Sequence, residues 1–145
     1  MQIFSHLLRK EYPDALTGIK YSNVTIPVND EVLTSAPAVI QTAECYIILT
    51  NQTVNDAPGT KCGEQYLASI QVDVITRYRV NSGAKALSEL ISVEVINRLK
   101  NDPPINIPGL KCWKWRLTTQ RGLREDSDAF RIYRNILVFS HNINE

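Results

Sequence analysis

The side chains of this 145-residue chain that are best suited to chemistry are a run of carboxylates, three cysteines and two histidines. Glu125, Asp126 and Asp128 resemble the start of a loop that holds a hard cation. Such a loop needs a glycine at its sixth position and a glutamate at its twelfth, and neither follows here. We therefore interpret these residues as solvated acids of a turn and expect no metal site.

The cysteines and histidines also lack a motif. Cys45, Cys62 and Cys112 are widely spaced, odd in number and without a CxxC pair, so neither a disulfide framework nor a zinc site is expected. His6 and His141 have no Cys, Asp or Ser at motif spacing. We expect buried or half-buried thiols, structural histidines and no catalytic residue. A small enzyme stays a lesser alternative, because a spatial constellation is invisible in sequence.

The glycines do not form a phosphate-binding loop. Gly59, Gly63, Gly109 and Gly122 are isolated and never fall into GxGxxG or GxxxxGK. Both patterns depend on backbone N–H groups that approach a phosphate closely, which needs glycines at fixed spacing. Nucleotide binding is therefore unsupported, and no cofactor is expected.

The strongest local charge bias lies in residues 111–134, which hold seven basic and three acidic side chains although the whole chain carries only +1. Basic residues interleaved with aromatic ones can contact phosphates and stack on bases. Strand alternation, however, places Trp113 and Trp115 on one face and Lys114 and Arg116 on the other. We interpret the rings as core and the basic residues as solvated or subunit-facing, with phosphate contact as the alternative.

Length and composition predict one domain that spans residues 1–145. Apolar residues make up 43% of the chain and charged residues 21%, close to the average of globular proteins. No apolar run approaches the roughly 20 residues of a membrane span, and the N-terminus lacks the pattern of a secretion signal. We expect synthesis in the cytoplasm and no membrane partner.

The first half of the chain mixes helix, strand and loop signals. Residues 2–10 predict a short amphipathic helix that Pro13 should end. Residues 17–28 predict one extended strand, and the apolar run 43–50 predicts a central strand covered on both faces. Residues 51–63 are rich in Asn, Asp, Gly and Pro and predict a long surface loop that could reach a neighbouring subunit.

The second half shows clearer periodicity. Residues 66–79 alternate strictly and predict a strand, and residues 82–100 predict a helix that lies on the sheet. Strands over 110–119 and 129–141 should form an antiparallel pair joined by a polar connection over 121–128. The expected buried stripe of the helix comprises Ala84, Leu87, Leu90, Ile91, Val93, Val95, Ile96 and Leu99. In the last strand the expected apolar face comprises Phe130, Ile132, Ile136 and Val138.

These elements together predict an α+β fold. The expected sheet is antiparallel or mixed with about four to five strands, and one long helix and a short N-terminal helix pack on it. No internal repeat and no second domain is visible in the sequence.

The order of elements resembles that of tail terminator or tail completion proteins of tailed bacteriophages. The resemblance rests on ECYIIL at 44–49, on the strand, turn and helix of YLASIQVDVITRYRVNSGAKALSELISVEVINRLKN at 66–101, and on FRIYRNILVFSHNI at 130–143. It covers most of the chain and lies in pattern and order, not in a signature motif. A longer loop at 51–63 and a longer proline linker at 101–109 depart from the family and leave the subfamily open, a ring protein of a crAss-like short-tailed phage being one candidate.

The resemblance implies a structural virion protein without enzymatic activity. Such a subunit would assemble in the host cytoplasm into a ring of about six or twelve copies in the tail or head–tail connector, joining tail components and lining the DNA passage. Arg121 and Arg124, expected in a loop, are the candidates for weak contact with DNA in that passage. Candidates for contacts between subunits are Asn55, Asp56, Lys61, Arg77, Arg79, Arg131 and Arg134. The alternative function is a nucleic-acid-binding accessory protein that uses the basic segment 111–134.

Overall fold

The computed structural model describes residues 2–21, 23–30, 37–40, 43–56, 65–79, 85–101, 111–126 and 129–144. Helix α1 spans Gln2–Leu16 and helix α2 spans Lys85–Asn101. The strands are β1 (Lys20–Tyr21), β2 (Val24–Thr25), β3 (Val28–Asp30), β4 (Ala38–Ile40), β5 (Ala43–Asp56), β6 (Gln65–Arg79), β7 (Lys111–Asp126) and β8 (Phe130–Asn144).

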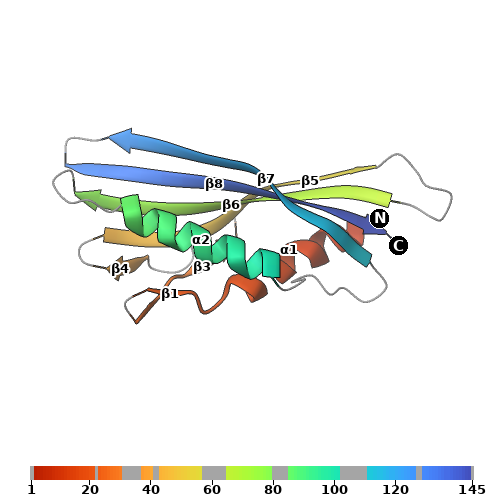
Figure 1. Ribbon diagram of the computed structural model, residues 1–145, viewed down its shortest axis with the longest axis horizontal. Coiled ribbons are helices and arrows are strands. Elements are labelled where there is room, and N and C mark those ends of the chain that lie inside the picture. The colour runs from red at the N-terminus through yellow and green to blue at the C-terminus, as the bar shows by residue number, and fades with distance from the viewer. Residues whose placement is uncertain are drawn as a thin grey trace.

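The long strands form a mixed six-stranded sheet in the order β3-β5-β6-β8-β7, in which β4 also pairs with β5. β5, β6, β8 and β7 pair antiparallel, whereas β3 runs parallel to β5. The sheet is strongly twisted, so that in Figure 1 the strands cross and their top-to-bottom order at one end of the molecule is the reverse of that at the other end. Both helices and the small β1–β2 sheet lie on one side, which we call the inner face of the sheet; the opposite side is the outer face.

The inner face carries the core because every second residue of the long strands points towards the helices. The alternation expected for residues 66–79 is confirmed, since all its predicted inward side chains are buried. From β6 these are Tyr66, Ala68, Ile70, Val72, Val74, Thr76 and Tyr78. From β5 and β8 the core adds Cys45, Ile47, Leu49, Leu137, Phe139 and Ile143. From α2 it adds Leu87, Ile91, Val95 and Leu99.

Helix α1 does not end before Pro13, as the sequence predicted, but continues to Leu16. Proline lacks an N–H, yet its carbonyl still accepts a hydrogen bond from the N–H of Thr17 at 2.9 Å. Tyr12 and Leu16 are fully buried in the core, and this burial offsets the missing bond. Gly18 lies two residues beyond the last helical residue, and its positive φ of 89° is one that glycine adopts readily after a helix.

Residues 17–28 do not form one strand. β1 and β2 pair as an antiparallel hairpin, and Asn23 in its turn has a positive φ of 64°, which asparagine tolerates well. The chain then turns so that β3 pairs with β5. Ile19 and Ile26 are buried, as expected for inward residues.

Strand β5 is longer than predicted and is not covered on both faces. It continues through residues 51–56, so half of the expected loop is strand, and residues 57–64 lie outside the described part of the chain. Along β5 buried Cys45, Ile47 and Leu49 alternate with half-buried Tyr46 and Ile48. Among the described residues, helices therefore lie on one side of the sheet (Figure 1).

Strand β7 is also longer than predicted, since residues 121–126 belong to it and not to a connection. Gly122 and four charged residues suggested a turn, but an edge strand with exposed side chains does not need an apolar face. In β8 the predicted apolar face is wrong as well. Ile132, Ile136 and Val138 are only half-buried on the outer face, whereas the side that carries Leu137 and Phe139 is the core.

Helix α2 turns a different stripe to the sheet than expected. Leu90 and Val93 are exposed, with 51% and 52% of their surface accessible, whereas Ser88 and Ser92 are buried. The hydroxyl of Ser92 accepts a hydrogen bond from the Asn135 amide at 2.8 Å and donates one to the Ser88 carbonyl at 2.8 Å. These bonds satisfy the Ser92 hydroxyl, so a serine can stand in the interface at this position. The buried Ser88 hydroxyl has no hydrogen-bond partner among the described residues. The expected turn 81–83 lies outside the described residues, as does the proline linker expected at 101–109 except for Asn101, which ends α2.

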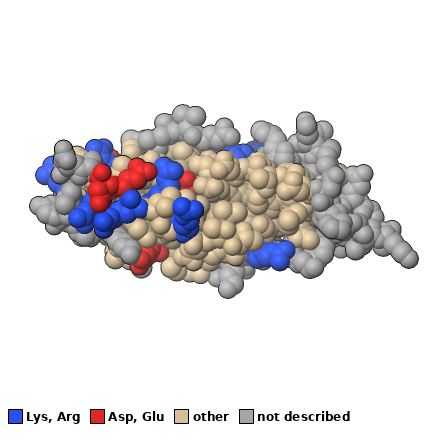
Figure 2. Space-filling view, turned by 90° about the horizontal axis from the view of Figure 1, so that it is seen from above, with Lys and Arg blue, Asp and Glu red and all other residues tan. Residues whose placement is uncertain are grey.

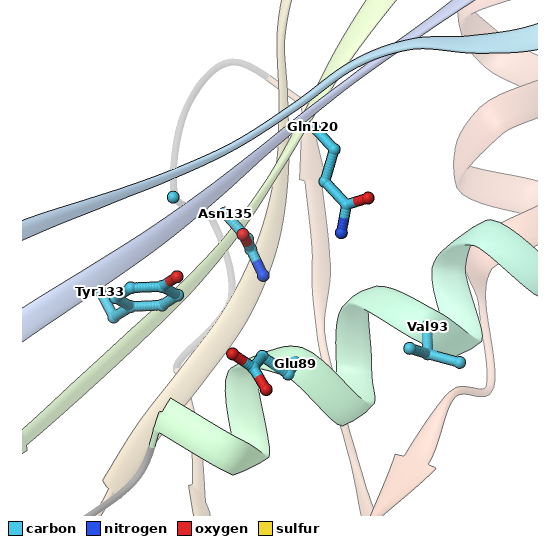
Figure 3. A pocket seen from close by; sticks show the side chains of 6 residues that line it. Glu89, Val93, Gln120, Tyr133 and Asn135 are labelled. Atoms are coloured by element: carbon cyan, nitrogen blue, oxygen red, sulfur yellow. The ribbon is translucent and has the colours of Figure 1, made fainter.

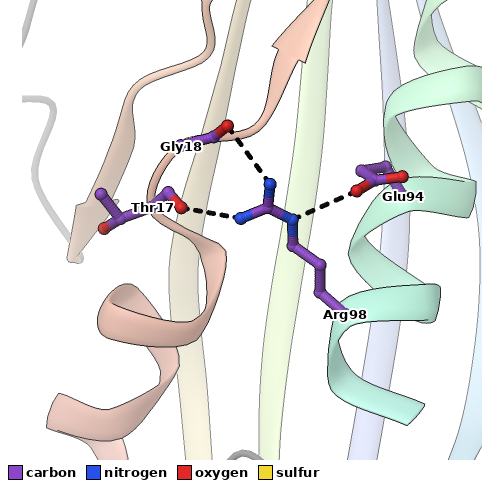
Figure 4. A network of polar contacts seen from close by, with 4 residues as sticks. All are labelled: Thr17, Gly18, Glu94 and Arg98. Atoms are coloured by element: carbon purple, nitrogen blue, oxygen red, sulfur yellow. Dashed lines mark hydrogen bonds and ion pairs between the residues drawn. The ribbon is translucent and has the colours of Figure 1, made fainter. Parts of the chain in front are cut away.

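Arg98 joins the two helices (Figure 4). Its guanidinium donates to the carbonyls of Thr17 at 2.7 Å and Gly18 at 3.2 Å, and Nε meets Glu94 at 3.2 Å. These carbonyls lie just beyond the C-terminal end of α1, where helical N–H donors are lacking.

The α+β class and the two helices are as predicted. The main sheet has six described strands instead of the expected four or five, and β1 and β2 form a separate small sheet.

Candidate assembly surface

No element of the described ranges packs on the outer face of the sheet (Figure 1). Its central rows hold half-buried Tyr46, Ile48, Ile136 and Val138. An apolar sheet face without a covering layer is typical of a surface that meets another molecule. Figure 2 shows this region as a broad uncharged area in the middle of the molecule.

One end of the outer face is small and polar. Thr53, Ser69 and Ser140 lie side by side on β5, β6 and β8. The hydroxyls of Thr53 and Ser69 form a hydrogen bond, and that of Thr118 donates to the Val138 carbonyl at 3.1 Å. These uncharged groups satisfy one another and leave little to attract an ion.

The opposite end is charged (Figure 2). Arg77 lies 3.8 Å from Glu44 and its guanidinium stacks 4.0 Å over the Phe130 ring. Such a stacked guanidinium is held flat against the sheet and still shows its edge to a partner. Arg79 and Arg134 add to the positive charge of this end.

Arg124 and Arg131 share one carboxylate. Asp126 lies 3.3 Å from Arg124 and 3.6 Å from Arg131, and all three side chains are partly exposed. Pairing of this kind contributes little to stability at a surface, but it reduces the net charge that a polyanion would meet. The basic character expected for segment 111–134 is therefore weaker than its count of arginines suggests.

Asp73 lies buried in the middle of the outer face. Gln71 donates to it at 2.9 Å, and Arg134 approaches to 3.9 Å. Burial raises the pKa of this carboxyl above its usual value, although the hydrogen bond from Gln71 and the charge of Arg134 act in the opposite direction. A carboxylate in such surroundings gains from a further donor, which a partner could supply.

The structure separates the predicted interface residues into two groups. Asn55 and Asp56 lie near the start of β6, where they pair with Leu67 and Tyr66. Arg77 and Arg79 lie at the far end of that strand, about 40 Å away at roughly 3.3 Å per residue. Arg134 lies on the same outer face as the arginines of β6, whereas Arg131 pairs with Tyr78 and points to the inner face. Lys61 is outside the described residues.

Arg121 and Arg124, expected in a loop that reaches a DNA passage, are exposed residues of strand β7. They point to opposite faces, because Arg121 pairs with half-buried Ile136 and Arg124 with Tyr133 of the inner face. Neither arginine therefore lies in a loop that could extend towards a DNA passage, which was the reason to expect them there. Sequence reasoning also missed Asp73 and Phe130, whose partners come from other strands.

A hollow of about 420 Å³ lies between α2 and the β7–β8 hairpin (Figure 3). Its lining comprises Glu89, Val93, Gln120, Gly122, Tyr133 and Asn135. The Tyr133 ring lies over Gly122, where a Cβ would collide with the tyrosine hydroxyl and lie 3.0 Å from Cζ. Glu89 is the single charged group of this lining, so the hollow is not arranged for acid–base chemistry.

The titratable groups of the core are held neutral. The Tyr12 hydroxyl and His141 Nε2 form a buried hydrogen bond, and burial lowers the pKa of His141 to about 4. Burial raises the pKa of the Cys45 thiol to about 11, so a reactive thiolate does not form there near neutral pH. Cys62 and the side chain of Cys112 are outside the described part of the chain.

The described residues contain neither a cluster of metal ligands nor a helix suited to span a membrane. Among them no group of three or more His, Cys, Asp or Glu side chains could hold a metal ion. Within the same residues, no helix is long and apolar enough to cross a membrane.

Comparison with known proteins identifies the fold. No protein-family model matches the chain, and no curated protein matches its sequence. Nineteen chains of solved structures match, one of them from the virion of a native gene transfer agent particle. The match to that chain has a TM-score of 0.57 and 18% sequence identity, and it covers 81% of this chain and 78% of the other. The two chains share a fold.

Proposed function

We propose that this chain is a structural subunit of a phage-like virion. The observation that carries the proposal is the shared fold with a chain of a gene transfer agent virion over 81% of the present sequence. The outer face supports it, because an uncovered sheet with half-buried Ile136 and Val138 suits a subunit that is buried on assembly. The order of elements, which resembles that of tail terminator proteins, points in the same direction.

Within such a particle, the proposed form is a closed ring in the tail or head–tail connector, joining neighbouring tail components. A ring needs two different contact surfaces on each subunit, because each copy meets one neighbour on either side. The separation of Asn55 and Asp56 from Arg77 and Arg79 by the length of β6 agrees with this requirement. The charged end would meet one neighbour and the β5–β6 end the other.

A weak attraction for DNA belongs to the same proposal. The arginines of the charged end, including Arg77 and Arg134, could attract phosphates without reading sequence. The small hydroxyl groups at the other end would let a duplex pass. Arg121 and Arg124 are lesser candidates here than the sequence indicated, since Asp126 already offsets the charge of Arg124.

Native mass spectrometry of the purified full chain tests the ring. A closed species of about six or twelve subunits is expected. Arg77→Glu combined with Arg79→Glu should shift the material towards smaller species, whereas Val93→Ala on the exposed side of α2 serves as the control. A protein that stays monomeric at high concentration, both alone and with tail material, would contradict the proposal.

A further inference from the structure

The second half of β7 is a regular strand with one unpaired edge. From Thr119 to Asp126 it pairs with β8 without irregularity, whereas shifts of register interrupt the pairing nearer its start. β7 ends the sheet, and in the described ranges no strand pairs with its other side. The backbone N–H and C=O groups of such an edge can receive a strand from another molecule.

The side chains on this edge carry opposite charges at symmetric positions. Arg121 and Glu125 are both exposed on the outer face, two residues on either side of half-buried Leu123. Neither forms an ion pair with another residue that the structure describes. Charged residues usually protect an edge from pairing. Opposite charges directly across from one another stabilise a strand pair, however, whereas like charges destabilise it.

We propose that β7 pairs antiparallel with β7 of a second copy of this chain, about a two-fold axis at Leu123. In this register Arg121 faces the partner's Glu125, Glu125 faces the partner's Arg121, and the two Leu123 side chains meet at the axis. On the inner face Gln120 faces the partner's Asp126. The same pair of opposite charges is thus formed twice, once on each side of the axis, as a two-fold contact requires.

Other strands of a second copy fit this edge less well. β3 and β4 have three residues each, too few for a regular stretch of eight. At the end of β5, residues 53–56 pair with β6 on one side, and no described strand pairs with their other side, but Asp56 is their single charged residue. Asp56 could face Arg121 of another copy, but Glu125 would then have no cation opposite it. β7 itself offers both charges.

This contact is independent of the proposed ring. A two-fold pairing closes on itself and does not extend around a ring, so it would join two copies or two rings. It uses the β7 edge and leaves the charged end of β6 and the end of β5 for other neighbours. It can therefore be tested with purified chain and without a particle.

A cysteine at the axis gives the first test. With Leu123→Cys, mild oxidation should produce a covalent dimer in which peptide mapping finds position 123 joined to position 123. Thr119→Cys is the matched control on the same face, because its two copies would lie about 26 Å apart at roughly 3.3 Å per residue and should not join. Equal cross-linking of both variants would overturn the register. With Leu123→Cys and Asn55→Cys in one chain, linkage of 123 to 55 between copies would overturn the partner.

Charge reversal gives the second test. Arg121→Glu places like charges together at both ends of the contact and should raise the dissociation constant for the dimer about tenfold in analytical ultracentrifugation. Arg121→Glu with Glu125→Arg restores opposite charges and should restore the dimer. Arg116→Glu, on β7 before the regular stretch, should change nothing. A double reversal as weak as the single one, or a monomeric parent chain, would refute the pairing.

Discussion

Leu137 and Ile136 are neighbours on β8, similar in size and apolar character, yet they lie in two different surroundings. Leu137 is fully buried between the sheet and α2, whereas Ile136 is half-buried on a face without a covering layer. The inner face is covered by the two helices, whereas no element of the described ranges covers the outer face. The comparison shows that apolar residues of similar size lie on both faces, and the proposed function assigns those of the outer face to association.

The largest effect should come from replacing Leu137. Leu137→Ala removes a fully buried side chain and should lower the free energy of unfolding by about 2–5 kcal/mol. Ile136→Ala should cost the isolated subunit about 1 kcal/mol, because its side chain already meets water. Urea denaturation at low protein concentration measures both. Equal losses would show that the outer face is packed as well as the inner one.

The second-largest effect should come from low pH, which should lower the free energy of unfolding through the core of the inner face. Burial lowers the pKa of His141 from its ordinary value of 6.5 to about 4 in the folded protein, so the unfolded chain binds a proton more readily. The part of the free energy of unfolding that depends on a neutral His141 is fully present above pH 6.5. It is lost as the pH falls towards 4, by up to about 3 kcal/mol. His141→Gln should flatten the pH dependence of unfolding in that interval. An unchanged slope would show that another group dominates it.

A smaller loss is expected where the Tyr133 ring crosses β7. Gly122→Ala places a Cβ against the tyrosine ring and should cost about 1–2 kcal/mol in thermal or urea unfolding, since the ring must shift. Combined with Tyr133→Ala, the same change should cost less than it does alone. Additive losses would indicate that the strand backbone, not the ring, opposes the substitution.

The smallest effect should follow a change at Asp73 on the outer face. Its folded-state pKa is raised, so its contribution to stability is greatest at low pH and is lost as the pH rises through that pKa. Asp73→Asn removes this dependence and should leave the subunit equally or slightly more stable, within about 1 kcal/mol at neutral pH. A clear loss at neutral pH would show that the contact with Arg134 outweighs burial.

The sequence predicted those parts of the fold in which periodicity and burial coincide. The alternation of β6 and the buried positions Leu87, Ile91, Val95 and Leu99 of α2 follow from spacing alone. Spacing could not show that Leu90 and Val93 would be exposed, because the buried side of the helix includes Ser92, whose hydroxyl accepts a hydrogen bond from Asn135. That partner lies 43 residues away in the chain.

The candidate site was predictable only as a set of residue types. The arginines near residues 121–134 were visible in the sequence, but their sharing of Asp126 depends on how β7 and β8 align. The continuation of β7 through Gly122 was not predictable, because an exposed edge strand has no apolar face to reveal it. The unbroken outer face needed the three-dimensional arrangement, since Ile136 and Leu137 satisfy the same pattern.

The bond between Tyr12 and His141 has a consequence for the order in which the chain is made. Its two residues are separated by 129 positions, so α1 leaves the ribosome long before β8, against which it packs. Until His141 has emerged, Tyr12 and Leu16 lack part of their core, and the apolar side of α1 stays exposed. Nascent chains in which His141 has not yet emerged should therefore rely on chaperones to keep this helix from associating with other molecules. If α1 stays unpacked until β8 has emerged, its segment should be sensitive to protease in stalled nascent chains that lack His141.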